Sequence, residues 1–145
     1  MLTTTDREKI LDLAAACLDR HNEILFACCH GSFMKDGPSR DIDIAIFLEP
    51  EFLSEINFRY EMQLEAELEK ALEIPAAVDV RILNTAKLGF QFHALRGRLL
   101  IDRKPEVRID FTRQVASRYL DIAPVLKHHT KEAFGFDPGP RPNPG

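Results

Sequence analysis

The sequence predicts an α/β (α+β) fold in which one layer of about four short strands is flanked by helices. Two observations support this prediction. In several segments apolar residues recur every three or four positions, which is typical of amphipathic helices. Between these segments lie short runs rich in isoleucine, valine, leucine and phenylalanine, which are typical of strands. Because the two kinds of segment alternate along the chain, we expect a sheet covered by helices.

Local signals set the bounds of each element. The expected elements, in chain order, are a helix over 5–20, a strand over 23–30, a strand over 42–48, a long helix from about 53 to before Pro75, a strand over 77–83, a helix from 84 or 85 to near 97, a strand over 98–102 and a last helix from 105. Thr5 and Glu8 form the capping-box signature of the first helix. Pro105 is a favoured first residue of a helix, and Pro124 is expected to kink or stop the last one.

The long helix carries an acidic run on the side opposite its apolar residues. The run consists of Glu61, Glu65, Glu69 and Glu73. Glutamates at helical spacing are typical of a face that is exposed to solvent. We therefore interpret this run as a solvated surface without a catalytic role.

Length and composition favour one soluble domain. The chain has 145 residues, 45% of them hydrophobic and 29% charged, and its apolar runs are too short to span a bilayer, so a membrane protein is not expected. Residues 135–145 hold four of the nine prolines and three of the seven glycines. We expect a single domain over 1–134, followed by a Pro/Gly-rich flexible tail over 135–145.

Charge and cysteine content narrow the partners and the compartment. The formal net charge is −4. Since the chain has no overall basic field, direct binding of nucleic acid is not expected. The three cysteines are odd in number, and Cys28 and Cys29 are adjacent, so their side chains point to opposite faces of a strand. A disulfide framework is therefore not expected, and the reducing cytoplasm is the predicted location.

Two aspartates lie at the start of the second strand. Side chains alternate along a strand, so Asp41 and Asp43 share one face while the isoleucines that follow them face the buried side. Asp79 lies within the next expected strand. If the two strands are neighbours, three carboxylates converge, and their oxygens suit Mg²⁺. In the alternative interpretation, the aspartates are capping residues and Asp79 pairs with Arg81 at a sheet edge.

A Gly-Ser pair precedes the aspartates. Gly31 ends the first strand and Ser32 follows it. A glycine at such a turn lets backbone N–H groups approach phosphate oxygens, and the serine adds a hydroxyl donor. Taken alone, the pair is equally typical of an ordinary turn.

Together these residues resemble a known motif. Gly31-Ser32, eight intervening residues and Asp41-Ile42-Asp43 before an apolar strand resemble the GS…DxD motif of the nucleotidyltransferase superfamily that includes DNA polymerase beta. The short chain and the later Asp79 are similar to its minimal, MNT-type members. The resemblance implies the nucleotidyltransferase fold with a small mixed sheet.

The resemblance also implies roles for individual residues. Asp41 and Asp43 are expected to ligate Mg²⁺, and Asp79 to be a third ligand or the general base. Gly31 and Ser32 are expected to hold the triphosphate of ATP. The implied reaction transfers a nucleoside monophosphate to a hydroxyl with loss of pyrophosphate.

The loop between the two motif halves departs from the family pattern. Members commonly carry an arginine there, whereas this chain has Lys35. A lysine contacts phosphate as a point charge and lacks the planar, bidentate geometry of arginine. We expect Lys35 to bind the nucleotide in this way.

The resemblance extends to a partner. The chain leaves no room for a separate acceptor-binding domain, and the minimal members resemble the antitoxin halves of pairs with an all-helical HEPN-type protein. This implies adenylylation of a hydroxyl, such as that of a tyrosine, on a partner toxin. Two alternatives stay open: a small-molecule nucleotidyltransferase of the aminoglycoside type, which would use the glutamate-rich helix as an acidic pocket, and an inactive module that binds only nucleotide or partner.

Overall fold

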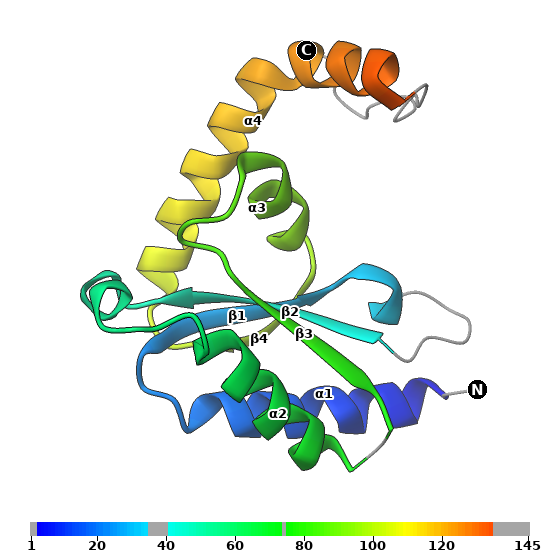
Figure 1. Cartoon of the computed structure of the whole chain (residues 1–145), viewed down its shortest axis with the longest axis vertical. Helices are drawn as coiled ribbons and strands as arrows, with labels where there is room; N and C mark the ends of the chain where they lie inside the picture. The colour runs from blue at the N-terminus through cyan, green and yellow to red at the C-terminus, as the bar shows by residue number, and fades with distance from the viewer. Residues whose placement is uncertain (1–2, 35–40, 74, 135–145) are drawn as a thin grey trace.

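The computed structural model describes residues 3–34, 41–73 and 75–134. Its elements are α1 (Thr4–Asp19), β1 (Ile24–His30), the 3₁₀ turn η1 (Gly31–Met34), β2 (Asp41–Leu48), the 3₁₀ turn η2 (Pro50–Ser54), α2 (Tyr60–Leu72), β3 (Ala77–Ile82), α3 (Leu88–Ala94), β4 (Arg98–Asp102) and α4 (Pro105–Phe134). The predicted fold class is confirmed: four strands form one sheet between helices (Figure 1). Figure 1 shows α1 and α2 on one face of the sheet and α3 and α4 on the other.

The sheet is mixed, with the strand order β3-β2-β1-β4. The central strand β1 pairs antiparallel with β2 and with β4. β2 and β3 are parallel, and α2 provides the crossover connection that parallel strands require. β3 therefore lies at one edge of the sheet.

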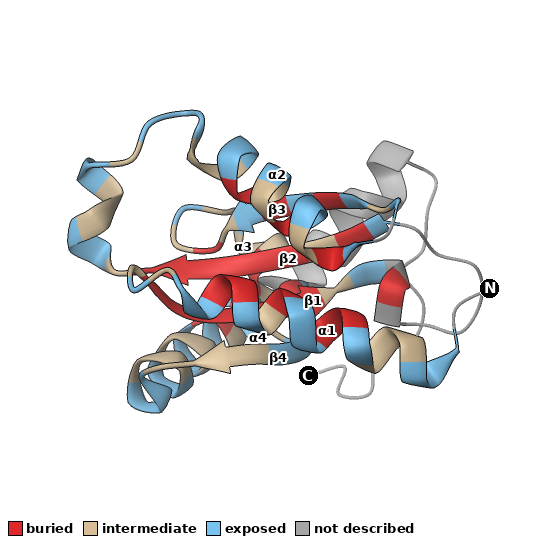
Figure 2. Cartoon of the chain, turned by 90° about the horizontal axis from the view of Figure 1, so that it is seen from below, coloured by how far each residue is buried: buried red, intermediate tan, exposed pale blue. Residues whose placement is uncertain are grey.

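The main core lies between the sheet and the helices α1 and α2. Ile42, Ile44 and Ile46 of β2 are fully buried in it, as the strand alternation predicts. They pack with residues at helical spacing in α1 and α2, including Leu18 and Leu68. β2 is buried without interruption from Ile44 to Leu48, which is the red part of its arrow in Figure 2.

The opposite face of β2 is buried only in its second half. Ala45 and Phe47 lie in a smaller core with Phe26, whose ring stacks on that of Phe47 at a centroid distance of 5.0 Å. Phe111 of α4 closes this core over Phe47 at 4.8 Å. The expectation that only the isoleucine side is buried is thus wrong from Ala45 onward, because α3 and α4 cover that part of the strand.

The first helix begins earlier than expected. Its capping box is formed by Thr3 and Asp6 rather than by Thr5 and Glu8. The Asp6 backbone N–H donates to the Thr3 hydroxyl at 3.0 Å, and the Thr3 N–H donates to the Asp6 carboxylate at 3.1 Å. The Glu8 carboxylate instead accepts two hydrogen bonds from Arg98, at 2.7 and 2.8 Å, and so joins α1 to β4.

The expected long helix is divided. Its first part is the turn η2, and α2 begins only at Tyr60. Between them the side chain of Asn57 accepts a hydrogen bond from the Arg59 N–H at 2.8 Å, and the Asn57 carbonyl accepts one from Tyr60. Asparagine competes with helical hydrogen bonding in this way, which explains the interruption.

The third helix also starts later, at Leu88. The side chain of Asn84 cannot cap it, because its oxygen accepts from the Leu48 N–H at 2.8 Å and its amide donates to the Leu48 carbonyl at 2.9 Å. The last helix continues past Pro124 to Phe134. In Figure 1 its ribbon changes direction in the orange part, so this helix is bent and does not stop there.

The acidic run is not simply a solvated surface. The carboxylates of Glu61, Glu65 and Glu69 accept hydrogen bonds from backbone N–H groups of the edge strand β3, and we call these three residues the glutamate ladder. The donors are Ile82 to Glu61 at 3.3 Å, Val80 to Glu65 at 2.8 Å and Val78 to Glu69 at 2.9 Å. These N–H groups point away from β2, so the ladder satisfies donors that an edge strand otherwise leaves unpaired.

The ladder predicts a specific cost of mutation. We expect Glu65→Ala to lower the free energy of unfolding by about 1–2 kcal/mol, because the Val80 N–H loses a charged acceptor. Glu65→Gln, which keeps an acceptor, should cost less. Urea unfolding measures both, and Gln63→Ala on the exposed side of α2 is the control. Equal stability of Glu65→Ala and Gln63→Ala would contradict a stabilising ladder.

The cysteines are free thiols, and all three are buried. Burial raises the pKa of Cys28 to about 11 and the pKa of Cys29 to about 12. At pH 8 both are therefore protonated and unreactive.

We expect iodoacetamide at pH 8 to leave the native protein unlabelled and to label three sites in guanidinium chloride, as counted by mass spectrometry. Rapid labelling of the native protein would show that these strands open readily.

Candidate active site

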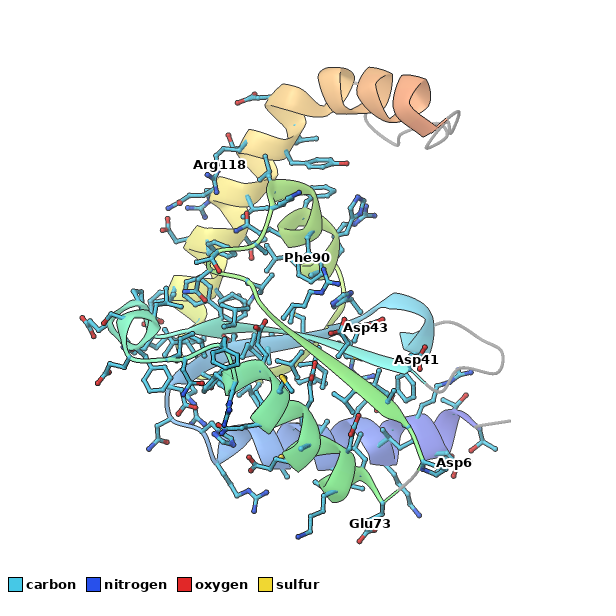
Figure 3. All side chains as sticks on the ribbon, viewed as in Figure 1. Asp6, Asp41, Asp43, Glu73, Phe90 and Arg118 are labelled. Carbon is cyan, nitrogen blue, oxygen red and sulfur yellow. The ribbon has the colours of Figure 1, made fainter. Side chains whose placement is uncertain are left out.

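The candidate site lies on the part of the sheet that α3 and α4 leave uncovered. Asp43 stands opposite His30 of β1 and beside Asp79 of the parallel strand β3. These three residues form a row across three strands, on the face opposite α1 and α2. Asp41 lies two residues earlier in β2, beside Ala77, and Figure 3 shows Asp41 and Asp43 at the same end of the sheet.

The turn at Gly31 is in close contact with Asp43. Gly31 has a φ of +81°, which is in the left-handed region that only glycine adopts without strain. A Cβ at this position would overlap an oxygen of the Asp43 carboxylate and lie 3.3 Å from its Cγ. Glycine is therefore required twice, for the backbone conformation and for the space that Asp43 occupies.

His30 lies at the β1 end of the row. Burial lowers the pKa of its imidazole, although the nearby carboxylates of Asp43 and Asp79 oppose the shift. Its ring meets the Phe90 ring edge-on at a centroid distance of 5.2 Å. His30 thus lies between Asp43 and Phe90 of α3.

Asp79 faces Arg81 on the same strand. The two side chains form an ion pair at 3.5 Å, and both are about half exposed. The guanidinium of Arg81 also lies over the Phe90 ring, 5.2 Å from its centroid. An exposed ion pair contributes little free energy, so the Asp79 carboxylate is available to other partners at low cost.

The structure brings four of the predicted site residues together. Gly31, Asp41, Asp43 and Asp79 lie along neighbouring segments, as expected. Lys35 and the side chain of Ser32 lie outside the described residues. Phe90 contacts both His30 and Arg81, but it carries no motif that would reveal this role in the sequence.

The same residues are suited to a divalent cation by the chemistry of their donors. Aspartate oxygens are the ligands that Mg²⁺ prefers, and the lack of a side chain at Gly31 lets the Asp43 carboxylate lie against the turn. In the described residues, however, no three His, Cys, Asp or Glu side chains are already gathered as a metal-binding group. The carboxylates are therefore adjacent by strand register, and Asp79 is turned toward Arg81.

This fold and this site define the class of protein. Residues 13–106 match the model of the family described as polymerase beta, nucleotidyltransferase. Because the match covers more than half of the chain, the protein belongs to this nucleotidyltransferase family. No curated protein sequence matches the chain significantly.

Several solved structures share the fold of this chain. It is similar to the MntA–HepT toxin–antitoxin structure, at 18% identity and a TM-score of 0.58, covering 92% of this chain and 97% of the other. A toxin–antitoxin structure with AMP-PNP matches at 18% identity and a TM-score of 0.61, covering 89% and 95%.

A third similar structure is a tri-AMPylated Shewanella oneidensis HEPN toxin in complex with an MNT antitoxin. It matches at 18% identity and a TM-score of 0.60, covering 92% of this chain and 97% of the other. At this identity the likeness concerns the fold, which is the one that the resemblance to MNT-type proteins implies. None of the described helices has the length and apolar character to cross a membrane.

The contact between Gly31 and Asp43 can be tested by comparing Gly31→Ala with a control variant, Gly89→Ala. We expect Gly31→Ala to lower the free energy of unfolding by about 2–3 kcal/mol, because a left-handed backbone and a blocked carboxylate add to the cost. It should also weaken ATP binding. Gly89→Ala is the control, since a Cβ at Gly89 meets nothing within 4 Å and alanine favours the helix by roughly 0.5–1 kcal/mol.

Thermal unfolding and a fluorescent ATP analogue measure the two effects. Gly89→Ala should leave nucleotide binding unchanged and unfold at the same temperature as wild type or higher. If Gly31→Ala bound ATP as tightly as Gly89→Ala does, the turn would have no role in holding phosphate.

Proposed function

We propose that this protein is a Mg²⁺-dependent nucleotidyltransferase that transfers AMP from ATP to a hydroxyl group of a HEPN-type partner protein, and so acts as the antitoxin of a cytoplasmic pair. The observation that carries the proposal is the row of Asp43 and Asp79 directly beside the turn at Gly31. Similar structures that contain AMP-PNP or an AMPylated HEPN toxin with an MNT antitoxin support the choice of nucleotide and partner.

The proposal gives each residue a task. The N–H groups at Gly31 and Ser32, with Lys35, bind the β- and γ-phosphates and keep the leaving pyrophosphate near β1. Asp41 and Asp43 would hold Mg²⁺, which neutralises charge on the reacting phosphates when it is bound. In this proposal residues 1–134 act as one catalytic domain.

Asp79 is suited to receive the proton of the acceptor hydroxyl. Its carboxylate is half exposed and forms an exposed ion pair with Arg81. In the transfer step the acceptor oxygen forms a bond to the α-phosphorus while the bond to pyrophosphate breaks. The hydroxyl proton moves to the Asp79 carboxylate, and Arg81 then stabilises the remaining negative charge on the phosphates. Asp79 thus serves as general base or, alternatively, as a third metal ligand.

The glutamates on which the aminoglycoside alternative depends have a structural task in the fold. That alternative would use the glutamates of α2 as a free acidic pocket for a polycation. Each carboxylate of the glutamate ladder instead accepts a hydrogen bond from β3. The similar structure that contains an AMPylated HEPN toxin favours a protein acceptor.

Replacing a carboxylate separates catalysis from binding. We expect Asp43→Asn to lower the rate of AMP transfer by roughly 10²–10⁴-fold, because a ligand and a charge are lost where phosphate reacts. The HEPN-type product of the adjacent gene, incubated with the protein, Mg²⁺ and ATP, is weighed by mass spectrometry for added AMP. Asp12→Asn on the exposed side of α1 is the control and should react as wild type does.

The same variant addresses the inactive-module alternative. Asp43→Asn should fold normally, because the side chain keeps its size and the repulsion between neighbouring carboxylates is reduced. If this variant still neutralised the partner in cells while making no AMP adduct, binding alone would be sufficient. An unmodified partner with the wild-type protein would contradict the proposed transfer itself.

A further inference from the structure

A groove of about 650 Å³ runs along the outer side of β3, next to the candidate site. Phe58 and Met62 line it from the α2 side, and Arg81, Lys87 and Phe90 line it from the other side. Asp79 also lines it, so the groove opens directly onto the proposed general base. Its volume is within the range of roughly 300–1,000 Å³ that is typical of ligand sites.

The geometry of phosphoryl transfer indicates from which side the acceptor approaches. Phosphoryl transfer proceeds roughly in line, so the acceptor enters opposite the leaving pyrophosphate. In the strand order β3-β2-β1 the turn at Gly31 lies on the β1 side of Asp43, and Asp79 lies on the β3 side. If pyrophosphate leaves near Gly31, the hydroxyl has to approach from β3, where the groove is.

We propose that this groove binds the segment of the partner protein that presents the acceptor hydroxyl to Asp79. The assignment rests on the proposed function and adds the binding site of its protein substrate. The occupant is a neutral or basic polypeptide segment with an aromatic side chain close to, or carrying, the hydroxyl.

The apolar side of the groove, formed by Phe58 and Met62, is the reason for expecting an aromatic side chain in the occupant. Phe58 is 81% exposed and Met62 is 63% exposed, which is unusual for side chains of their size. Exposed apolar residues grouped in a groove are typical of interaction sites. Phe90 provides a second aromatic surface on the facing wall and lies on the same face of the sheet as Asp43 in Figure 3. An aromatic ring bound between these walls would place a polar group within reach of Asp79.

The edge of β3 excludes one mode of binding. An extended peptide could in principle pair with this strand and extend the sheet. The N–H groups that such a peptide needs already donate to the glutamate ladder. Recognition in the groove therefore depends on side chains rather than on strand addition.

Charge selects a polypeptide over a nucleic acid. Three carboxylates line the groove, from Glu61, Glu65 and Asp79, against the two cations Arg81 and Lys87, and Arg81 is already paired with Asp79. A phosphate backbone or an acidic peptide would be repelled by this excess of negative charge. A segment with lysine or arginine beside its aromatic residue complements it.

The test measures binding separately from transfer. The probe is a fluorescent synthetic peptide with one tyrosine flanked by lysines, titrated with the full chain in the absence of ATP. We expect Phe58→Ala and Met62→Ala each to weaken its binding by about tenfold, as is typical of central apolar contacts. The control Ile109→Ala removes a side chain that is 45% exposed on α4, away from the groove, and should bind as wild type does. Binding of ATP should be unchanged in all three variants.

The measurements distinguish failure of the groove assignment from failure of the proposed function. Peptide affinity that is equal in Phe58→Ala and wild type, or too weak to detect with wild type, would overturn the groove assignment. The same follows if a glutamate-flanked peptide or a single-stranded oligonucleotide binds more tightly than the lysine-flanked one. If Phe58→Ala lost peptide binding but wild type transferred no AMP, the groove would stand as a binding site and the proposed function would fail. If Phe58→Ala transferred AMP to the partner as fast as wild type does, the proposed function would stand and the assignment of the groove would fail.

Discussion

The contact between the backbone of Gly31 and the carboxylate of Asp43 is the constraint on which the site depends. The turn can follow β1 so closely only because its first residue lacks a side chain and adopts a left-handed conformation. This contact fixes where the turn lies relative to the carboxylates of β2. The antiparallel register of β1 and β2 then places His30 opposite Asp43, and the parallel register of β2 and β3 adds Asp79 on the other side. Three strands and one turn thus determine the positions of His30, Asp43 and Asp79.

The uneven cover of the sheet makes this arrangement accessible. On the face toward α1 and α2, the isoleucines of β2 are buried along the whole strand. On the other face, Phe111 and α3 cover Ala45 and Phe47 but end before Asp43. The same strand therefore anchors the core with one half of this face and presents carboxylates with the other half. Burial of large aromatic rings next to the site gives the exposed half a rigid support.

The sequence predicted the strands well and the helix starts less well, for a physical reason. Alternation and apolar runs depend on residues within the strand itself, and the strand over 98–102 has the predicted bounds. The starts of α2 and α3 depend instead on Asn57 and Asn84, whose side chains bond to backbone groups that only the folded chain brings near them. The acidic run was misinterpreted for the same reason, because helical spacing does not show which backbone donors lie opposite a carboxylate.

Of the candidate site, the motif residues could be predicted because the period of a strand places Asp41 and Asp43 on one face. That Asp79 lies beside Asp43 follows from the two apolar strand patterns once the strands are adjacent. The ion pair of Asp79 with Arg81 was only an alternative in the sequence, since two residues on one strand face need not touch. Phe58 and Met62 lie around the start of α2 and Phe90 lies in α3, so nothing local in the sequence could show that they line one groove.

The glutamate ladder also restricts how copies of this chain can associate. A sheet of four strands has two borders, and at the β3 border the outward donors already have carboxylate partners. A second copy that prolonged the sheet by main-chain pairing would have to do so at β4. The border nearest the candidate site is thereby protected from strand addition by a second copy.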